Sequence, residues 1–308
     1  MRFVVILLAV LLDGGGSVSQ STRVAGSSVS LTPPTGFSTS ARFAGFERAD
    51  LQASIMVTEL PAPFAGITRG MTASGLASRG MTLLASKRMT VDGREALLVH
   101  ASQQANGADV LKWLLISGDA KASVMIVATF PRSAEAELSD AVRASLLTAR
   151  WNSATTAAPD PFEGLAFRVT PTRTLKIAGR VNNLLTLTES GSMTQQSVSA
   201  AMLFVGTSLA PVKLDDLAGY AEARALKTAQ LKGLRISQRA SITIDGASGH
   251  ELVAEGSDVK TGRAVTLYQV MAPEGDGYVL IQGLVASSRA AVMVPEFRQV
   301  AQSYRRQR

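Results

Sequence analysis

Apolar and polar residues alternate in short stretches of the chain, and these stretches end at residues that favour turns. Residues 240–246 read ASITIDG, so Ile242 and Ile244 flank Thr243 and an Asp-Gly pair follows. A period of two is typical of a β-strand with one buried face. An Asp-Gly pair favours a tight hairpin, because glycine tolerates positive φ. The pattern therefore predicts antiparallel strands joined by short turns.

This pattern occurs twice along the chain. Residues 80–93 (GMTLLASKRMTVDG) match residues 233–246 (GLRISQRASITIDG) without a gap, at an offset of 153 residues. Further on, Trp113 in LKWLLIS matches Tyr268 in TLYQVMA. A repeat of this length indicates a duplicated domain, because the units of solenoid proteins run about 20–50 residues.

The repeat divides the chain of 308 residues into two domains, as expected at roughly 150 residues per domain. We place a signal peptide at 1–19, the first domain at 29–151 and the second at 162–308. Between the domains, residues 152–161 are small, polar and include two prolines, which suits a linker.

Each half is predicted to contain one helix before its meander of strands and a closing helix after it. Residues 64–78 form a weak candidate, because three glycines lower the helix propensity. Residues 214–232 form a better one, with Asp215 and Asp216 in the first turn and Gly233 as the stop. The closing helix of the first half is predicted to begin at Ser133 as N-cap. Each half is thus predicted to be α+β, an antiparallel sheet flanked by helices.

The order strand, strand, helix, four-strand meander, helix resembles the Mog1/PsbP-like α/β/α fold, which includes bacterial DUF1795-type exported proteins. The resemblance is carried by LDDLAGYAEA at 214–223, by the T-[VI]-D-G turns at 90–93 and 243–246, and by the meander after each turn. It would cover most of both halves, as two tandem domains. The resemblance implies a non-enzymatic binding or assembly-factor role and assigns no functional residue.

The first residues, MRFVVILLAVLL, predict a targeting segment. An unbroken apolar run of ten residues, Phe3–Leu12, follows Arg2. Such a run is too short for a membrane span, which needs about 20 residues, and suits the core of a signal peptide, about 7–15 residues. Small residues at Ser17 and Ser19 predict cleavage after Ser19. An uncleaved anchor and a buried strand are the alternatives. We therefore expect an exported protein of the periplasm.

Composition excludes several classes of chemistry. The chain has no cysteine and two histidines, so disulfides, iron–sulfur clusters, thiolate zinc sites and a three-histidine zinc site are ruled out. The formal net charge is +7. Aromatic residues make up 5% and no nucleic-acid-binding motif occurs, so we expect no nucleic-acid partner. No cofactor motif is present, and we expect no cofactor and no metal.

The candidate site residues are few. His100 and His250 fall at different positions of the repeat, which argues against a shared catalytic or metal site. Trp113 and Tyr268 are expected to be buried, one in each core; the alternative is a ligand-facing aromatic between sheet and helix. The tail YRRQR carries Arg305, Arg306 and Arg308. These arginines are candidates for contact with an anionic envelope surface, or simply a solvated helix end.

Together these features predict an exported, non-enzymatic binding or assembly-factor protein of the bacterial envelope, with a protein partner. One alternative is a periplasmic carrier of a small apolar or lipid-like ligand held between helix and sheet. Another is a hydrolase whose site carries no recognisable motif.

Overall fold

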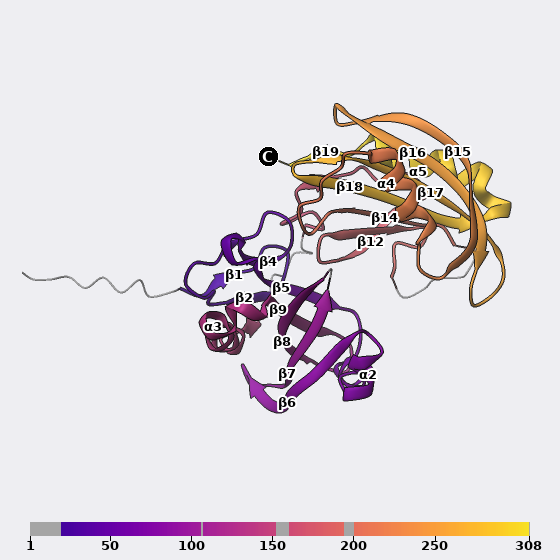
Figure 1. Ribbon diagram of the computed structural model, residues 1–308. Helices are drawn as coiled ribbons and strands as arrows, with labels where there is room; N and C mark the ends of the chain where they lie inside the picture. The colour runs from indigo at the N-terminus through magenta and orange to yellow at the C-terminus, as the bar shows by residue number, and fades with distance from the viewer. Residues whose placement is uncertain (1–19, 106, 152–159, 194–199, 308) are drawn as a thin grey trace, which may run out of the picture.

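The computed structural model describes residues 20–105, 107–151, 160–193 and 200–307. It is an α+β protein with two seven-stranded antiparallel sheets, one in each half of the chain (Figure 1). The predicted signal peptide and residues 152–159 of the predicted linker lie outside the described residues, so both remain predictions.

The first sheet has the strand order β3-β4-β5-β9-β8-β7-β6. Its strands are, along the chain, β3 Ser38–Thr39, β4 Gly45–Arg48, β5 Ala53–Leu60, β6 Met81–Val91, β7 Arg94–Ala105, β8 Ala108–Gly118 and β9 Ser123–Pro131. A 3-10 turn, η1 (Ala49–Leu51), joins β4 to β5.

The second sheet has the order β12-β13-β14-β18-β17-β16-β15, which is the same order of succession as in the first sheet. Its strands are β12 Lys176–Val181, β13 Leu184–Thr188, β14 Met202–Thr207, β15 Leu231–Ile244, β16 Ala247–Asp258, β17 Ala264–Glu274 and β18 Gly277–Ala286. The two seven-stranded sheets therefore share one strand order, and the prediction of an antiparallel sheet with helices in each half is confirmed.

The Asp-Gly turns lie where the sequence places them. Asp92-Gly93 joins β6 to β7 and Asp245-Gly246 joins β15 to β16, and both strand pairs are antiparallel. Both residues of each turn have positive φ, from 47° to 81°, the geometry of the hairpin turn that follows strand twist.

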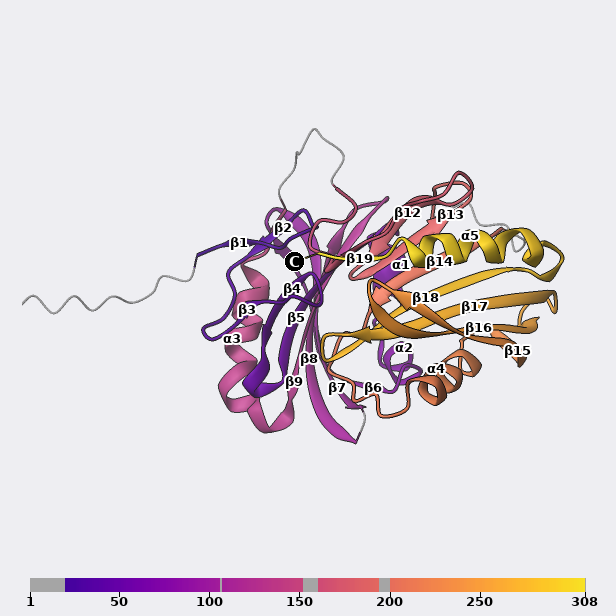
Figure 2. The same ribbon diagram turned by 90° about the horizontal axis from the view of Figure 1, so that it is seen from above.

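Helices cover both faces of each sheet. In the first half, α3 (Glu135–Leu147) packs on one face, while α1 (Phe64–Arg69) and α2 (Ala73–Ala77) pack on the other (Figure 2). In the second half, α5 (Ala290–Gln302) and α4 (Leu217–Leu226) cover opposite faces in the same way. Alternate residues of each central strand therefore enter two separate apolar cores.

The helix boundaries correct two expectations in the first half. Ser133 is not an N-cap, because the chain enters α3 through a 3-10 turn, η2 (Arg132–Ala134), and α3 has no side-chain cap. The segment 64–78 divides at Gly70, and Thr72 caps the second helix by accepting from the N–H of Gly75 at 3.1 Å.

The helix predicted at 214–232 is shorter, and Gly233 does not end it. Asp216 is the N-cap and accepts from the N–H of Gly219 at 2.9 Å, whereas Asp215 precedes the helix and pairs with Lys213. Residues from Leu231 onward belong to β15, where they pair with the end of β16. Gly233, at φ +65°, lies at a register shift of this strand. Sheet pairing thus overrides local helix propensity here.

Short strands close each half. β2 (Val29–Leu31) pairs with β10 (Arg150–Trp151), which follows α3, and also with β1 (Thr22–Arg23). In the second half β11 (Phe167–Arg168) pairs with β19 (Arg305–Arg306), which follows α5. A 3-10 turn, η3 (Ser287–Arg289), precedes α5 as η2 precedes α3.

The two halves contact each other near the β12–β13 hairpin. Arg180 donates to the backbone oxygen of Gly26 at 2.7 Å and to that of Glu163. The side-chain oxygen of Asn182 accepts from the N–H of Ala44 at 3.4 Å. Arg42 also forms an ion pair with Asp276 at 2.5 Å, so polar contacts join the halves.

Candidate functional site

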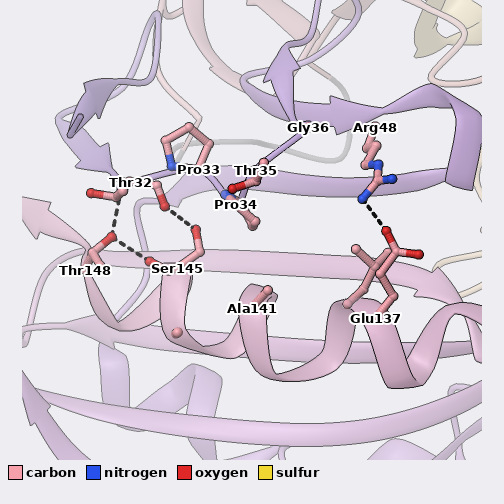
Figure 3. Close-up of a pocket in the computed structure, with 12 residues that line it drawn as sticks. Thr32, Pro33, Pro34, Thr35, Gly36, Arg48, Glu137, Ala141, Ser145 and Thr148 are labelled. Atoms are coloured by element: carbon pink, nitrogen blue, oxygen red, sulfur yellow. Dashed lines mark hydrogen bonds and ion pairs between the residues drawn. The ribbon is translucent and has the colours of Figure 1, made fainter. Parts of the chain in front are cut away.

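An open groove of about 610 Å³ lies between α3 and the extended segment before β3 (Figure 3). We name it the α3 groove. Its lining residues are Thr32, Pro33, Pro34, Thr35, Gly36, Arg48, Glu137, Leu138, Ala141, Ala144, Ser145 and Thr148.

The groove follows from the residues on its two walls. Pro33 and Pro34 hold their φ near −65° and cannot donate backbone hydrogen bonds, so this segment runs extended beside the helix. Across from it, Ala141 and Ala144 present only methyl groups on exposed positions of α3. Small side chains opposite a stiff extended segment leave the space between them unfilled.

Hydroxyl groups fasten one end of the groove. Ser145 donates to the backbone oxygen of Thr32 at 2.6 Å. The Thr148 hydroxyl accepts from the N–H of Thr32 at 2.8 Å and donates to the backbone oxygen of Ser145 at 2.7 Å. These hydroxyls are committed to structural hydrogen bonds, which makes them poor nucleophiles.

Charges mark the other end. Arg48 forms an ion pair of 2.6 Å with Glu137 at the start of α3 and a longer one, 3.4 Å, with Asp50. The hydrogen bond to Glu137 raises the pKa of Arg48, although burial opposes this change. Glu137 is more exposed than Arg48, so both signs of charge are accessible to a bound molecule at this end.

The second half has an equivalent hydrogen bond between an extended segment and the end of a helix. Thr170 and Pro171 follow β11, and the N–H of Thr170 donates to the hydroxyl of Ser303 at 2.8 Å. Ser303 ends α5 as Thr148 ends α3. The Thr-Pro pairs were a signal in the sequence that could have located this contact, although nothing local indicated which helix it would meet.

The histidines lie on different faces in the two halves. His100, on β7, stacks on Trp113 with ring centroids 4.1 Å apart and planes at 6°. Burial is the main cause that lowers the pKa of His100. His250, on β16, lies 3.5 Å from Glu222 on α4. Arg239 forms a double hydrogen bond with Glu222 and is the first cause of the lowered pKa of that carboxyl.

No metal cluster emerges around these groups. Within the described ranges, no three residues among His, Asp and Glu come together to hold a metal ion. The His250–Glu222 distance exceeds the range of a normal hydrogen bond, and neither histidine carries the hydrogen-bonded serine that nucleophilic catalysis needs among the described contacts.

The two candidate aromatics differ in burial. Tyr268 is fully buried in the second core, and its hydroxyl donates to Glu251 at 2.7 Å. Trp113 is half-buried, which corrects the expectation of a buried ring. Its indole N–H donates to Ser139 on α3 at 3.0 Å.

Arg305 and Arg306 are held within the fold. Arg305 lies 4.0 Å from Asp245, and Arg306 pairs with Glu274 at 2.6 Å. Both belong to β19, not to a helix end, because they pair with β11. Arg308 lies outside the described residues. A contact of this tail with an anionic surface remains a prediction.

No described helix is long and apolar enough to cross a membrane.

No protein-family model and no curated protein matches the sequence. Among solved structures, the chain is similar to LpqN of Mycobacterium tuberculosis, involved in cell envelope biogenesis, at 10% identity over 45% of this chain and 81% of that one, with a TM-score of 0.35. It is also similar to the T6SS immunity protein TplEi of Pseudomonas aeruginosa, which was solved with a peptide. The identity is 11% over 88% of this chain and 98% of that one, with a TM-score of 0.34.

A third similar structure is PsbP of the cyanobacterium Synechocystis, at 10% identity over 50% of this chain and 98% of that one, with a TM-score of 0.29. LpqN and PsbP are thus among the matched structures, although identity is low and each covers about half of this chain.

Proposed function

We propose that this chain is an exported, non-enzymatic protein of the bacterial envelope that binds a protein partner through the α3 groove. The observation that supports this proposal is a preformed groove whose hydroxyls already bond within the fold. A binding surface of this kind needs no rearrangement before it accepts a partner, which reduces the entropic cost of association.

The shape and lining of the groove favour an extended segment of the partner. One wall is a proline-containing segment, the other is an exposed face of α3 with two alanines, and an ion pair lies at one end. An extended chain can lay small apolar side chains over Ala141 and Ala144. A charged side chain of the partner can then replace one member of the Arg48–Glu137 pair.

The geometry gives less support to a hydrolase. Catalysis by a serine or threonine needs a neighbouring base oriented by a third group. In the groove, Ser145 and Thr148 donate to backbone oxygens instead. A turnover of ester or peptide substrates by the purified chain, abolished by Ser145→Ala, would contradict the non-enzymatic proposal.

Site-specific photo-crosslinking tests the groove. A benzoylphenylalanine in place of Ala144 lies in the groove, whereas the same residue in place of Asp140 lies on the same helix at a side chain that is 98% exposed. We expect a discrete crosslinked protein from position 144 in envelope extracts and none from position 140.

A blocking variant completes this test. Ala141→Arg places a long side chain in the groove and should reduce the crosslink from position 144 at least tenfold. Equal crosslinking from positions 144 and 140 contradicts binding through the groove. A crosslink from position 144 whose yield does not change in Ala141→Arg contradicts it as well. Export is tested separately by N-terminal sequencing, where we expect the mature chain to begin at Gln20.

A further inference from the structure

A second cavity, of about 360 Å³, lies on the opposite face of the first sheet, between the sheet and α1 with the segment up to β6. We name it the α1 pocket. Most of its lining is apolar and includes three methionines; the lining residues are Leu60, Gly66, Ile67, Met71, Arg79, Met81, Lys112, Leu114, Met125 and Val127. Its volume falls within the range of about 300–1,000 Å³ typical of small-molecule sites.

Two cations interrupt this apolar lining. Lys112 lies on β8 between apolar residues and is half-buried. Arg79 lies after α2, and its guanidinium passes over Gly70, where an added Cβ would be 3.1 Å from the nearest nitrogen. Among the described residues, neither cation forms an ion pair or a side-chain hydrogen bond.

Lys112 is partly removed from water and has no carboxylate partner among the described residues. Burial alone lowers its pKa, and no carboxylate offsets this effect. Removing an ion from water is costly, and an opposite charge placed beside it offsets that cost. An unpaired lysine beside an apolar cavity therefore indicates a site that an anion can complete.

The second half supplies an internal comparison, because the topology places Leu267 where the first half has Lys112. Its neighbour Gln269 donates to the backbone oxygen of Ala221 on α4 at 2.8 Å, and Gln282 donates to Gln269 at 3.0 Å. These amides fasten the helix to the sheet.

The first half has the reverse arrangement. Leu114 and Val127 stand at the positions of the two glutamines and pair across β8 and β9 in the same register. The amide network that fastens α4 is thus replaced by an apolar floor, and a lysine replaces Leu267. The first half is therefore apolar where the second half has two glutamines, and it carries a cation where the second half has a leucine. A pocket for an amphipathic anion combines an apolar lining with a cation in this way.

We propose that the α1 pocket binds a carboxylate with a single aliphatic chain of medium length. The carboxylate pairs with Lys112 and Arg79, and the chain lies over Met71, Met81 and Met125. Methionine suits this role, because its flexible side chain adapts to irregular apolar surfaces. This site is distinct from the α3 groove, which lies on the other face of the sheet.

Isothermal titration of the full chain tests the proposal with four ligands. We expect decanoate to bind, decanol to bind at least tenfold more weakly because it has no charge, and acetate not to bind because it has no chain. Lengthening the ligand from octanoate to decanoate should tighten binding about threefold to fourfold per CH₂, which corresponds to ~0.8 kcal/mol for each buried CH₂.

Two variants locate the ligand. Lys112→Met keeps the volume and removes one of the two charges, so it should weaken decanoate binding toward that of decanol. The matched control Lys87→Met, at an exposed position of β6, should bind as wild type. Gly66 lines the pocket and a Cβ there meets nothing within 4 Å, so Gly66→Leu adds a side chain at the pocket without a clash of its Cβ and should weaken binding of both ligands.

Several results would overturn the proposal: no decanoate binding by the wild-type chain, equal affinity for decanoate and decanol, or unchanged binding by Lys112→Met or by Gly66→Leu. The ligand series on the wild-type chain tests the proposal even if a variant does not fold. Because neither variant alters the α3 groove, both should retain the crosslink from position 144, which separates this proposal from the proposed function.

Discussion

The carboxylate of Asp92 accepts a 2.8 Å hydrogen bond from the backbone N–H of Trp151, so the turn between β6 and β7 holds the strand that follows α3. Asp245 accepts from the N–H of Arg306 at 3.1 Å in the same way in the second half. The Asp-Gly turns thus have a second role, because each fastens the end of its own half.

Removing this carboxylate should destabilise the first half. Asp92→Ala loses a hydrogen bond to a charged group and places alanine at φ +50°, so we expect the free energy of unfolding to fall by about 1.5–3 kcal/mol. Asp92→Asn tolerates positive φ and still accepts a hydrogen bond, so its cost should be smaller. Urea unfolding measures both, and equal stability of Asp92→Ala and wild type would contradict this role.

The stack of His100 on Trp113 predicts a pH dependence. Because burial lowers the pKa of His100 below its ordinary value of 6.5, the unfolded state binds a proton that the folded state resists. The contribution of His100 to the free energy of unfolding is therefore complete above about pH 6.5 and is lost as the pH falls from there toward the lower folded-state pKa. The slope of stability against pH in this window should be shallower in His100→Gln, and identical slopes refute the prediction.

Trp113 and Tyr268 should differ in their energetic roles. Deleting a fully buried large side chain costs about 3–5 kcal/mol, and Tyr268→Ala should fall in this range. Trp113→Ala should cost less, about 2–3 kcal/mol, since its ring is half-buried. Ser139→Ala, which removes only the hydrogen bond to the indole, should cost about 1 kcal/mol. Denaturant unfolding ranks the variants, and the reverse order for Trp113 and Tyr268 would show that burial does not decide their contributions.

Glu251 joins β16, β17 and α5. It accepts from Tyr268 at 2.7 Å and from Arg298 at 2.7 and 3.1 Å. Burial, followed by the bond to Glu251, raises the pKa of Tyr268. Glu251→Ala leaves a buried hydroxyl and a guanidinium without their acceptor, so we expect a loss of about 2–4 kcal/mol. Tyr268→Phe should cost about 1–2 kcal/mol. Thermal unfolding measures the difference, and a smaller loss for Glu251→Ala than for Tyr268→Phe speaks against a shared network.

Arg180 should couple the two halves. Arg180→Ala removes hydrogen bonds to Gly26 and Glu163, which should lower stability by about 1–3 kcal/mol and broaden the calorimetric transition. The exposed Arg173 serves as the control, and Arg173→Ala should leave both quantities unchanged. A single sharp transition at the wild-type temperature for Arg180→Ala contradicts the coupling.

Strands and hairpin turns were predictable because their signals are short. The alternation in ASITIDG and the glycine at positive φ act within a few residues, so they survive in the folded chain. Helix ends were less predictable. Residues 231–232 pair with β16 instead of extending α4, because a partner strand far along the chain supplies hydrogen bonds that a local pattern does not reveal.

The candidate sites could not be predicted from local patterns. The α3 groove depends on Thr32 meeting Ser145, which lies 113 residues later. The α1 pocket depends on Lys112 reaching the same cavity as Arg79 and on which face of β8 each residue occupies.

The sequence by itself determined the α+β class, the antiparallel meander in each half, the Asp-Gly turns and the absence of cysteine chemistry. The tertiary structure alone decided that Tyr268 is enclosed while Trp113 is half-buried, that Arg305 and Arg306 pair within the fold, and that Lys112 faces an unfilled pocket. The physical reason is that backbone preferences act between neighbours in the chain, whereas burial, ion pairing and cavities arise only when distant segments pack against one another.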